Sequence, residues 1–277
     1  MHRTARADIA FTMSPGQSQV AFMIAVAKVP GLRVEEEFSV RLDGVDQEVL
    51  PADAPHDGRI HLFEVDVSEG APGQVQVAYH AEVTDDRETD PASDQIPTTT
   101  ELLTYLRPSR YAESDRLLPT ARKEFNGLDG LEQLNAVASF VHDQLSYVPG
   151  ASRFTDGSVE TLLQRRGVCR DYAHLAVALL RGLDVPARCA AVYAPGLDPM
   201  DFHAVAEAWV EGRWHVVDAT RLAPRQSLLR IATGRDTADT AFMSTYGAGT
   251  RLGPLSVQAT IDGDLPVDDH TGPVALP

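Results

Sequence analysis

The segment at residues 169–183 limits the folds that this chain can adopt. Its apolar side chains recur at helical spacing, and they cover two faces of the helix instead of one. Gly182 and Pro186 mark its end. A helix that is apolar on two faces has to be covered on both, so the sequence predicts a central, buried helix with other elements packed around it.

The first part of the chain has a different pattern. Across residues 8–83, short alternating segments are separated by turn pairs such as Pro30-Gly31 and Asp57-Gly58. Period-two alternation with regular turns is typical of an antiparallel sandwich, so we expect an N-terminal β-sandwich domain at residues 1–95. Residues 85–100 are acidic and rich in Pro, Ser and Thr, which indicates a linker.

Beyond the linker, helical and strand patterns alternate with turns, and we assign residues 96–262 to one core domain. Residues 131–147 carry apolar positions on one helical face, and a shorter helix is expected between Ser158 and Gly167. Strands are expected at residues 187–193, 203–210, 213–219 and 255–261. Residues 263–277 are acidic and contain proline, so a loose C-terminal tail is expected there.

Charge and apolar content bear on the partners and the location of the protein. The chain has 24 basic and 40 acidic residues, a formal net charge of -16 at pH 7, which argues against nucleic acid and against an anionic membrane surface. The longest apolar run, at residues 20–26, is far shorter than the roughly 20 residues that span a bilayer. With no secretory signal visible and only two cysteines, we expect a soluble protein of the cytoplasm.

The dipeptide Glu211-Gly212 predicts a two-residue hairpin turn between two of the strands. With that turn, His203 and Asp218 lie on one face of the hairpin as diagonal neighbours, roughly 7 to 8 Å apart at the backbone. This separation is within reach of an imidazole ring and a carboxylate. The sequence therefore predicts a hydrogen bond between His203 and Asp218.

Cys169 begins the central helix, where the peptide dipoles favour the thiolate form of a cysteine. His174 follows five positions later, about 140° around the helix axis, and is poorly placed to serve the same sulfur. His203 arrives from a strand and is the better base, with Asp218 orienting its ring. Cys169, His203 and Asp218 are thus the predicted catalytic residues of a cysteine-dependent enzyme.

Other polar residues have structural interpretations. Cys189 lies within a strand and is expected to be a small buried hydrophobe. Asp171 supports the first turn of the central helix electrostatically or contributes to the site. Glu207 shares the His203 face and either supports the site or pairs with Arg213 or Arg188. Asp218 could instead cap the turn toward Ala219 and Thr220.

Metal and nucleotide chemistry is not supported by the sequence. Cys169, His174 and His203 lack the regular spacing and the fourth donor of a zinc site, and a metal on the thiolate would quench it as a nucleophile. No glycine-rich phosphate loop precedes a helix. We therefore expect no metal and no other cofactor.

Several motifs in one order resemble bacterial transglutaminase-like proteins, a group often described as cysteine proteases. The resemblance covers roughly residues 100–250. The motifs that carry it are YLRPSRY at residues 105–111, GVCRDYAH at 167–174, DFHA at 201–204, DAT at 218–220 and RIATGRD at 230–236. A β-sandwich ahead of the core is also typical of this group.

The resemblance implies an α+β fold class: a papain-like core with a central helix on an antiparallel sheet. It also implies that Cys169 is the nucleophile, His203 the base and then the acid, and Asp218 the residue that orients the histidine. In this mechanism, the nucleophile's backbone amide and a second, upstream donor hold the oxyanion, and Tyr147 is the candidate for that donor. Members often have His-Ala-Trp at the catalytic histidine, whereas this chain has Val205 in place of the indole.

The expected reaction is acyl transfer on peptide or amide bonds through a thioester. Release of the thioester to water gives a peptidase or amidase, which is the preferred interpretation. Release to an amine gives a transglutaminase, and a binding protein that retains the fold without catalysis is the third alternative. The expected partner is a peptide, protein or amide substrate.

Overall fold

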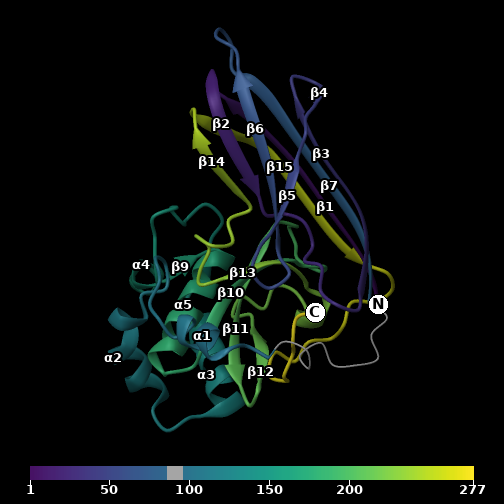
Figure 1. The fold of residues 1–277 in the computed structure, drawn as a ribbon. Helices are drawn as coiled ribbons and strands as arrows, with labels where there is room; N and C mark the ends of the chain where they lie inside the picture. Colours follow the sequence, from purple (N-terminus) through teal and green to yellow (C-terminus); the bar gives the residue numbers. More distant parts are fainter. Residues whose placement is uncertain (86–95) are drawn as a thin grey trace.

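Alternating apolar residues form the two sheets of a β-sandwich in the computed structural model, which describes residues 1–85 and 96–277 (Figure 1). The first sheet has the strand order β15-β1-β7-β3-β4, and the second has the order β14-β2-β6-β5. The strands are β1 (His2–Met13), β2 (Gly16–Phe22), β3 (Leu32–Leu42), β4 (Val45–Asp46), β5 (Leu50–Asp53), β6 (Arg59–Val67), β7 (Gly73–Asp85), β14 (Met243–Gly247) and β15 (Thr250–Ile261).

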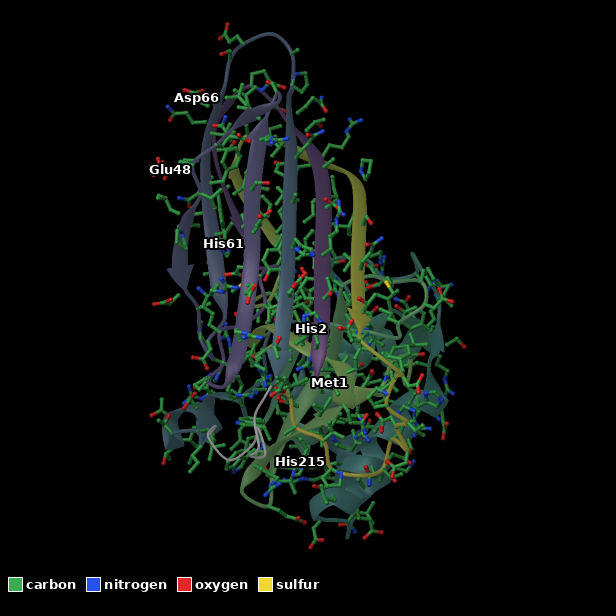
Figure 2. The ribbon with its side chains drawn as sticks, turned by 90° about the vertical axis from the view of Figure 1, so that its right-hand side faces the viewer. Met1, His2, Glu48, His61, Asp66 and His215 are labelled. Carbon is green, nitrogen blue, oxygen red and sulfur yellow. The ribbon has the colours of Figure 1, made fainter. Side chains whose placement is uncertain are left out.

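Burial along the strands follows the alternation in the sequence. In β7, every second residue from Gly73 to Val83 is buried, and these residues contribute to one apolar core between the sheets. The predicted sandwich is therefore confirmed. Figure 2 shows the five-stranded sheet face-on, with Met1 and His2 at the end of the sandwich that meets the rest of the molecule. The predicted domain boundary at residue 95 lies outside the described residues.

The prediction for residues 255–261 was wrong in one respect. They form a strand, but β15 pairs antiparallel with β1 from Arg3↔Ile261 to Met13↔Thr250, so it belongs to the sandwich and not to the core. In the same way, β14 pairs with β2. Period-two alternation identifies a strand, but it does not identify the sheet that the strand joins, because the pairing depends on a free edge elsewhere in the molecule.

The rest of the chain is an α+β core. An antiparallel sheet has the strand order β12-β11-β10-β13, and β8 and β9 form a short parallel pair. The core strands are β8 (Ser146–Tyr147), β9 (Arg166–Gly167), β10 (Ala187–Tyr193), β11 (His203–Val210), β12 (Arg213–Val217) and β13 (Leu229–Gly234). The helices are α1 (Thr99–Thr104), α2 (Ser114–Phe125), α3 (Gly130–Gln144), α4 (Ser158–Gln164), α5 (Cys169–Gly182) and the 3-10 helix η2 (Arg225–Ser227).

Helix α5 is the centre of this core. All but its first two residues are buried, and it packs against α2, α3 and α4 on its outer side and against β11 and β10 on the other (Figure 1). The hairpin register is the predicted one, from Val210↔Arg213 to Ala206↔Val217. The prediction of a buried central helix on an antiparallel sheet is confirmed. None of the helices in residues 1–85 and 96–277 is long and apolar enough to cross a membrane.

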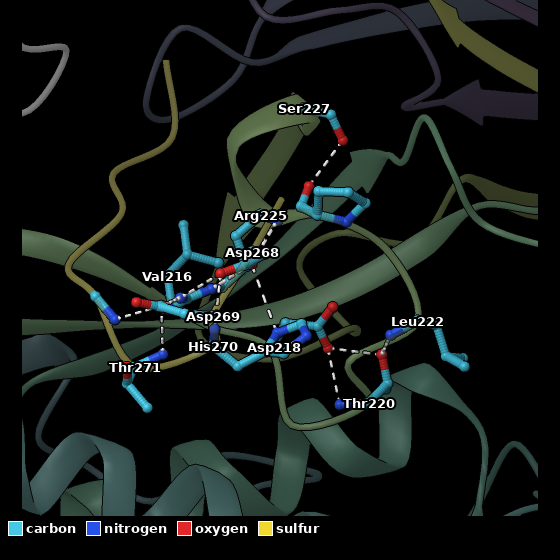
Figure 3. A network of polar contacts seen from close by, with 12 residues as sticks. Val216, Asp218, Thr220, Leu222, Arg225, Ser227, Asp268, Asp269, His270 and Thr271 are labelled. Atoms are coloured by element: carbon cyan, nitrogen blue, oxygen red, sulfur yellow. Dashed lines mark hydrogen bonds and ion pairs between the residues drawn. The ribbon is translucent and has the colours of Figure 1, made fainter. Parts of the chain in front are cut away.

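The C-terminal tail is packed, not loose. Leu276 is buried against the face of the sheet opposite α5, and the Val216 N–H donates to the carbonyl of Val274 at 2.7 Å. The Arg225 guanidinium donates two hydrogen bonds to Asp268, of 2.8 and 2.7 Å, inside the protein (Figure 3). Acidic composition indicated an exposed tail, but here an acidic residue neutralises a buried arginine.

The sandwich and the α+β core are joined by one continuous cluster of buried apolar side chains. Tyr193, Leu229 and Ile231 from the core sheet lie in the same cluster as the inner faces of the sandwich. The Tyr193 hydroxyl donates to the carbonyl of Ile24 at 2.7 Å, and the Ala27 N–H donates to the carbonyl of Arg230 at 2.9 Å. The sandwich is thus packed and hydrogen-bonded onto the core sheet.

The tail contact leads to a stability prediction. Asp268→Asn should lower the free energy of unfolding by about 3 kcal/mol, because it removes the buried carboxylate that pairs with Arg225 and leaves only the exposed Asp269, 3.8 Å away. The exposed pair Arg41 and Asp46 provides a matched control, and Asp46→Asn should change stability much less, because solvent screens this pair. Urea unfolding of the three proteins measures both values. Equal, small effects of the two substitutions would contradict a structural role of the tail.

Candidate active site

The start of helix α5 is set by Asp171. Its carboxylate accepts a hydrogen bond of 2.8 Å from the Val168 N–H, just ahead of the helix, and one of 2.9 Å from the Ser152 hydroxyl. Burial raises the pKa of Asp171, although both of these donors act in the opposite direction. Asp171 is thus a support for the first turn, one of its two predicted roles, and it fixes the position of Cys169.

Gly167 is needed next to this carboxylate. A Cβ atom at residue 167 would lie 2.6 Å from the Cβ atom of Asp171 and 2.7 Å from a carboxylate oxygen, closer than non-bonded atoms approach. The glycine therefore allows β9 to run against the capping residue. This contact explains the spacing Gly-Val-Cys-Arg-Asp at the start of the helix.

His203 and Asp218 are hydrogen-bonded, as predicted from the hairpin register. Nε2 of His203 lies 3.0 Å from Oδ2 of Asp218, and both side chains are fully buried. The other oxygen, Oδ1, accepts from the Thr220 hydroxyl at 2.7 Å and from the Thr220 N–H at 2.9 Å (Figure 3). Asp218 therefore makes both predicted contacts, one with each oxygen.

The electrostatics of this pair favour its charged form. Burial by itself would lower the pKa of His203, but the charge and hydrogen bond of Asp218, together with interactions with the Cys169 side chain, raise this pKa to about 10. Burial would raise the pKa of Asp218, but the imidazolium and the two Thr220 donors lower it. An imidazolium beside a carboxylate is the state that this geometry stabilises.

Cys169 lies close enough to His203 for its side chain to affect the pKa of the imidazole. Its side chain is partly exposed, and the sulfur lies 3.8 Å from the carbonyl oxygen of Phe202, the residue before His203. Nδ1 of His203 is buried and has no hydrogen-bond partner among the described residues. Because Nε2 is taken by Asp218, Nδ1 is the nitrogen left for the thiol. The structure therefore brings Cys169, His203 and Asp218 together.

Tyr147 lies beside Cys169 because β8 pairs with β9, with Tyr147 opposite Gly167. Burial and the nearby Cys169 raise the pKa of Tyr147 well above its usual value, so the phenol keeps its proton at neutral pH. The structure thus places Tyr147 near the thiol, and its role as a donor stays a prediction.

Glu207 is not part of this group. Arg188 donates to its carboxylate at 2.8 Å and Arg230 at 2.7 Å, and all three side chains are buried. Burial would raise the pKa of Glu207, but the two guanidinium groups lower it to about 2. The predicted pairing with Arg188 is confirmed, and Glu207 has a structural position. Cys189 is also fully buried, which raises the pKa of its thiol to about 12.

The motif at residues 230–236 forms contacts that position the residues around helix α5. Asp236 accepts a hydrogen bond of 2.9 Å from the Tyr111 N–H, and Tyr111 stacks on the fully buried His174. Burial lowers the pKa of His174 to about 3, and its Nε2 accepts from the Thr237 N–H at 3.1 Å. His174 is therefore a neutral structural residue, as its helical position predicted.

Cys169 opens into a cleft of about 490 Å³ between the core and the sandwich. Most of its lining is apolar, and its charged or titratable members are Tyr111, Cys169, Arg170, Asp201 and His203. In residues 1–85 and 96–277, no group of three or more His, Cys, Asp or Glu residues is arranged to hold a metal ion. What the site offers chemically is a thiol, a paired imidazole and hydrogen-bond donors.

Comparisons with known proteins match the region that contains Cys169, His203 and Asp218. The family model described as the transglutaminase-like superfamily matches residues 120–219. A protein from Mycobacterium leprae is 26% identical over 165 residues, 56% of this chain and 59% of that protein, and one from Mycobacterium tuberculosis is 34% identical over 124 residues, 39% and 40% of the two chains. Both are called uncharacterized, and the matched regions span only about half of these relatives.

A solved structure matches almost the whole chain. The protein is from Cytophaga hutchinsonii and is described as a "Putative Cysteine Protease"; it is 28% identical, covers 97% of this chain and 93% of its own, and has a TM-score of 0.83. The fold is that of the transglutaminase-like class, and these likenesses support a cysteine-dependent enzyme. Within that class, residues 120–219 are a transglutaminase-like domain, and the chain has the architecture of the Cytophaga protein.

The raised pKa of His203 leads to a pH prediction. Because the folded value, about 10, exceeds the unfolded value of about 6.5, the stability that the pair contributes is complete below about pH 6.5 and is lost as the pH rises toward 10. Cys169→Ala removes the titrating thiol and its share of this shift, but Asp218 still raises the pKa of His203. The unfolding free energy of Cys169→Ala should therefore exceed that of the double variant Cys169→Ala/His203→Gln by more at pH 6 than at pH 9.5. One pKa unit is worth about 1.4 kcal/mol, so the difference should shrink by at least about that amount. A difference that is constant between the two pH values would contradict the charged pair.

Proposed function

We propose that this protein is a peptidase or amidase that cleaves its substrate through a thioester on Cys169. The observation that carries the proposal is the buried pair of His203 and Asp218, with Nε2 and Oδ2 3.0 Å apart, next to a partly exposed thiol at the start of a helix and within a cleft. A thiol, a base and a group that orients the base are the components of nucleophilic acyl transfer.

The residues have separate roles in the proposed reaction. The Cys169 thiolate attacks the amide carbonyl, and His203 gives its proton to the departing amine as the C–N bond breaks. His203 then takes a proton from water, the resulting hydroxide attacks the thioester, and the carboxylic acid leaves while the thiolate is restored. Asp218 holds the ring so that Nε2 faces the carboxylate and Nδ1 faces the sulfur.

The attack of the thiolate places a negative charge on the carbonyl oxygen of the substrate, and hydrogen-bond donors next to that oxygen stabilise it. The Cys169 N–H belongs to the first turn of α5, where backbone donors have no partner within the helix. The Tyr147 phenol lies near Cys169 and keeps its proton. We assign these two groups to the oxyanion.

Water is the preferred acceptor because the Cytophaga protein, which shares the architecture, is described as a protease. One observation favours an amine acceptor instead. Asp201, an exposed carboxylate in the cleft, could bind a primary ammonium group beside the thioester. Transfer to an amine is therefore the second candidate function. A non-catalytic binding protein is the third, and it would not need the buried imidazole and carboxylate pair.

An assay in which the protein is incubated with a mixture of peptides, with and without methylamine, distinguishes the three candidate functions. Mass spectrometry should reveal cleaved or deamidated peptides in amounts that do not depend on methylamine. Cys169→Ala should abolish these products, and His203→Ala should reduce their rate by a factor of about 1,000 or more, the scale for loss of a triad member. Methylamide products in excess of hydrolysis would establish the amine transferase. Equal product levels in the native protein and in Cys169→Ala would favour the binding protein.

Loss of the Tyr147 hydroxyl tests the oxyanion assignment. Tyr147→Phe should lower kcat about 100-fold with little change in KM, because the phenol would act on the developing charge and not on the bound substrate. Tyr172→Phe is the matched control, since its ring lies 6.0 Å from that of Tyr147 in the same helix-start region. Similar kcat values for Tyr147→Phe and Tyr172→Phe would overturn the assignment.

A further inference from the structure

The cleft that contains Cys169 has one wall from the sandwich. Leu252 and Leu255 of β15 line it, as does Met23, the residue after β2. On the core side, the exposed ring of Phe154 lines the same cleft, and its backbone carbonyl accepts a hydrogen bond of 2.8 Å from the Tyr111 hydroxyl. Large apolar side chains therefore line the cleft from both parts of the molecule.

A β-bulge places the two leucines on the same side of β15. Leu255 pairs with Ile9 and Leu252 pairs with Phe11, so two residues, Gly253 and Pro254, lie opposite Ala10 alone. Residues three apart in a regular strand point to opposite faces, but the extra residue of the bulge brings them to one face. Gly253 suits the bulge because a Cβ atom there would lie 3.0 Å from the carbonyl oxygen of Ala10.

The face that the leucines share is the inner face of the sandwich. Their partners Ile9 and Phe11 are buried in the sandwich core, and Leu255 packs against that core. Leu252, however, is 45% exposed, although it is a leucine on the face that is buried elsewhere along the sheet. The apolar inner face thus continues out of the sandwich core and into the cleft.

This wall is held in position relative to the site. Phe202, the neighbour of His203, stacks on Phe242, which precedes β14, with ring centroids 5.3 Å apart. Phe202 also contacts Tyr193, whose hydroxyl is hydrogen-bonded to the carbonyl of Ile24. A wall fixed by such contacts is preorganised, so binding against it needs little ordering of the protein.

We propose that Leu252 and Leu255 are specificity-determining residues that hold an apolar side chain of the peptide or amide substrate against Cys169. All titratable side chains of the lining come from the core, whereas the sandwich wall has only apolar side chains; the titratable ones are Tyr111, Cys169, Arg170, Asp201 and His203. A charged substrate group would lose its hydration against that wall, and an apolar one would gain by leaving water. The inference rests on the proposed function, since it takes the bound molecule to be the acyl donor.

Two alkylating probes test this wall without requiring turnover. N-phenethyl iodoacetamide carries an apolar group and plain iodoacetamide does not, and Cys169 is the reporter because Cys189 is fully buried. In the native protein, the phenethyl probe should label Cys169 about tenfold faster than the plain probe, as expected for one apolar group in a pocket. Leu252→Ser should bring this ratio close to one, whereas Leu252→Met should keep it.

Leu50→Ser is the matched control, because Leu50 is a sandwich leucine of similar exposure, 51%, on β5 and outside the cleft lining. It should keep the native ratio. An unchanged ratio in Leu252→Ser, or an equal loss in Leu50→Ser, would overturn the proposal. His203→Ala separates this result from the proposed function: slower labelling by plain iodoacetamide reports the activated thiol, whereas the ratio of the two probes reports the wall alone.

Discussion

A buried ionic cluster sets the geometry on which the site depends. Glu207 on β11 bonds to Arg188 on β10 and to Arg230 on β13, and none of the three side chains is more than 2% exposed. Loss of one partner from such a cluster costs roughly 3 to 5 kcal/mol, because it leaves a charge buried and unpaired. A shift of β11 by one residue would have the same cost, since it would turn Glu207 to the other face. The cluster therefore fixes the register of the strand that carries His203.

The site itself balances burial against charge. Burial disfavours the charged forms of His203 and Asp218, yet each holds the other in its charged form. Asp171 has a comparable role at the helix, where its carboxylate accepts the backbone N–H ahead of Cys169. Polar groups inside the protein thus orient one another, and the thiol, which is partly exposed, is free to react. In the proposed enzyme, the thiol of Cys169 is accessible from the cleft, whereas the side chains that orient it, His203, Asp218 and Asp171, are buried.

The cleft shows why the two parts of the chain work as one unit. The core contributes the thiol and the imidazole, and the sandwich contributes an apolar wall through the bulge in β15. The apolar side chains inside the sandwich pack against Tyr193, Leu229 and Ile231 of the sheet that carries His203. The apolar wall therefore keeps a fixed position relative to the site. The sandwich is therefore part of the candidate site and not an appended domain.

The sequence by itself determined the sandwich in the first part of the chain, the central helix and the pairing of His203 with Asp218. These features depend on local patterns: period two for strands, helical spacing for α5, and a two-residue turn that fixes the hairpin register. Tertiary structure decided the rest. The return of β14 and β15 to the sandwich, the packing of the tail on Arg225 and the apolar wall at Leu252 all join segments far apart in the sequence. Such contacts depend on which edges and surfaces the folded chain leaves open, and no local pattern records that.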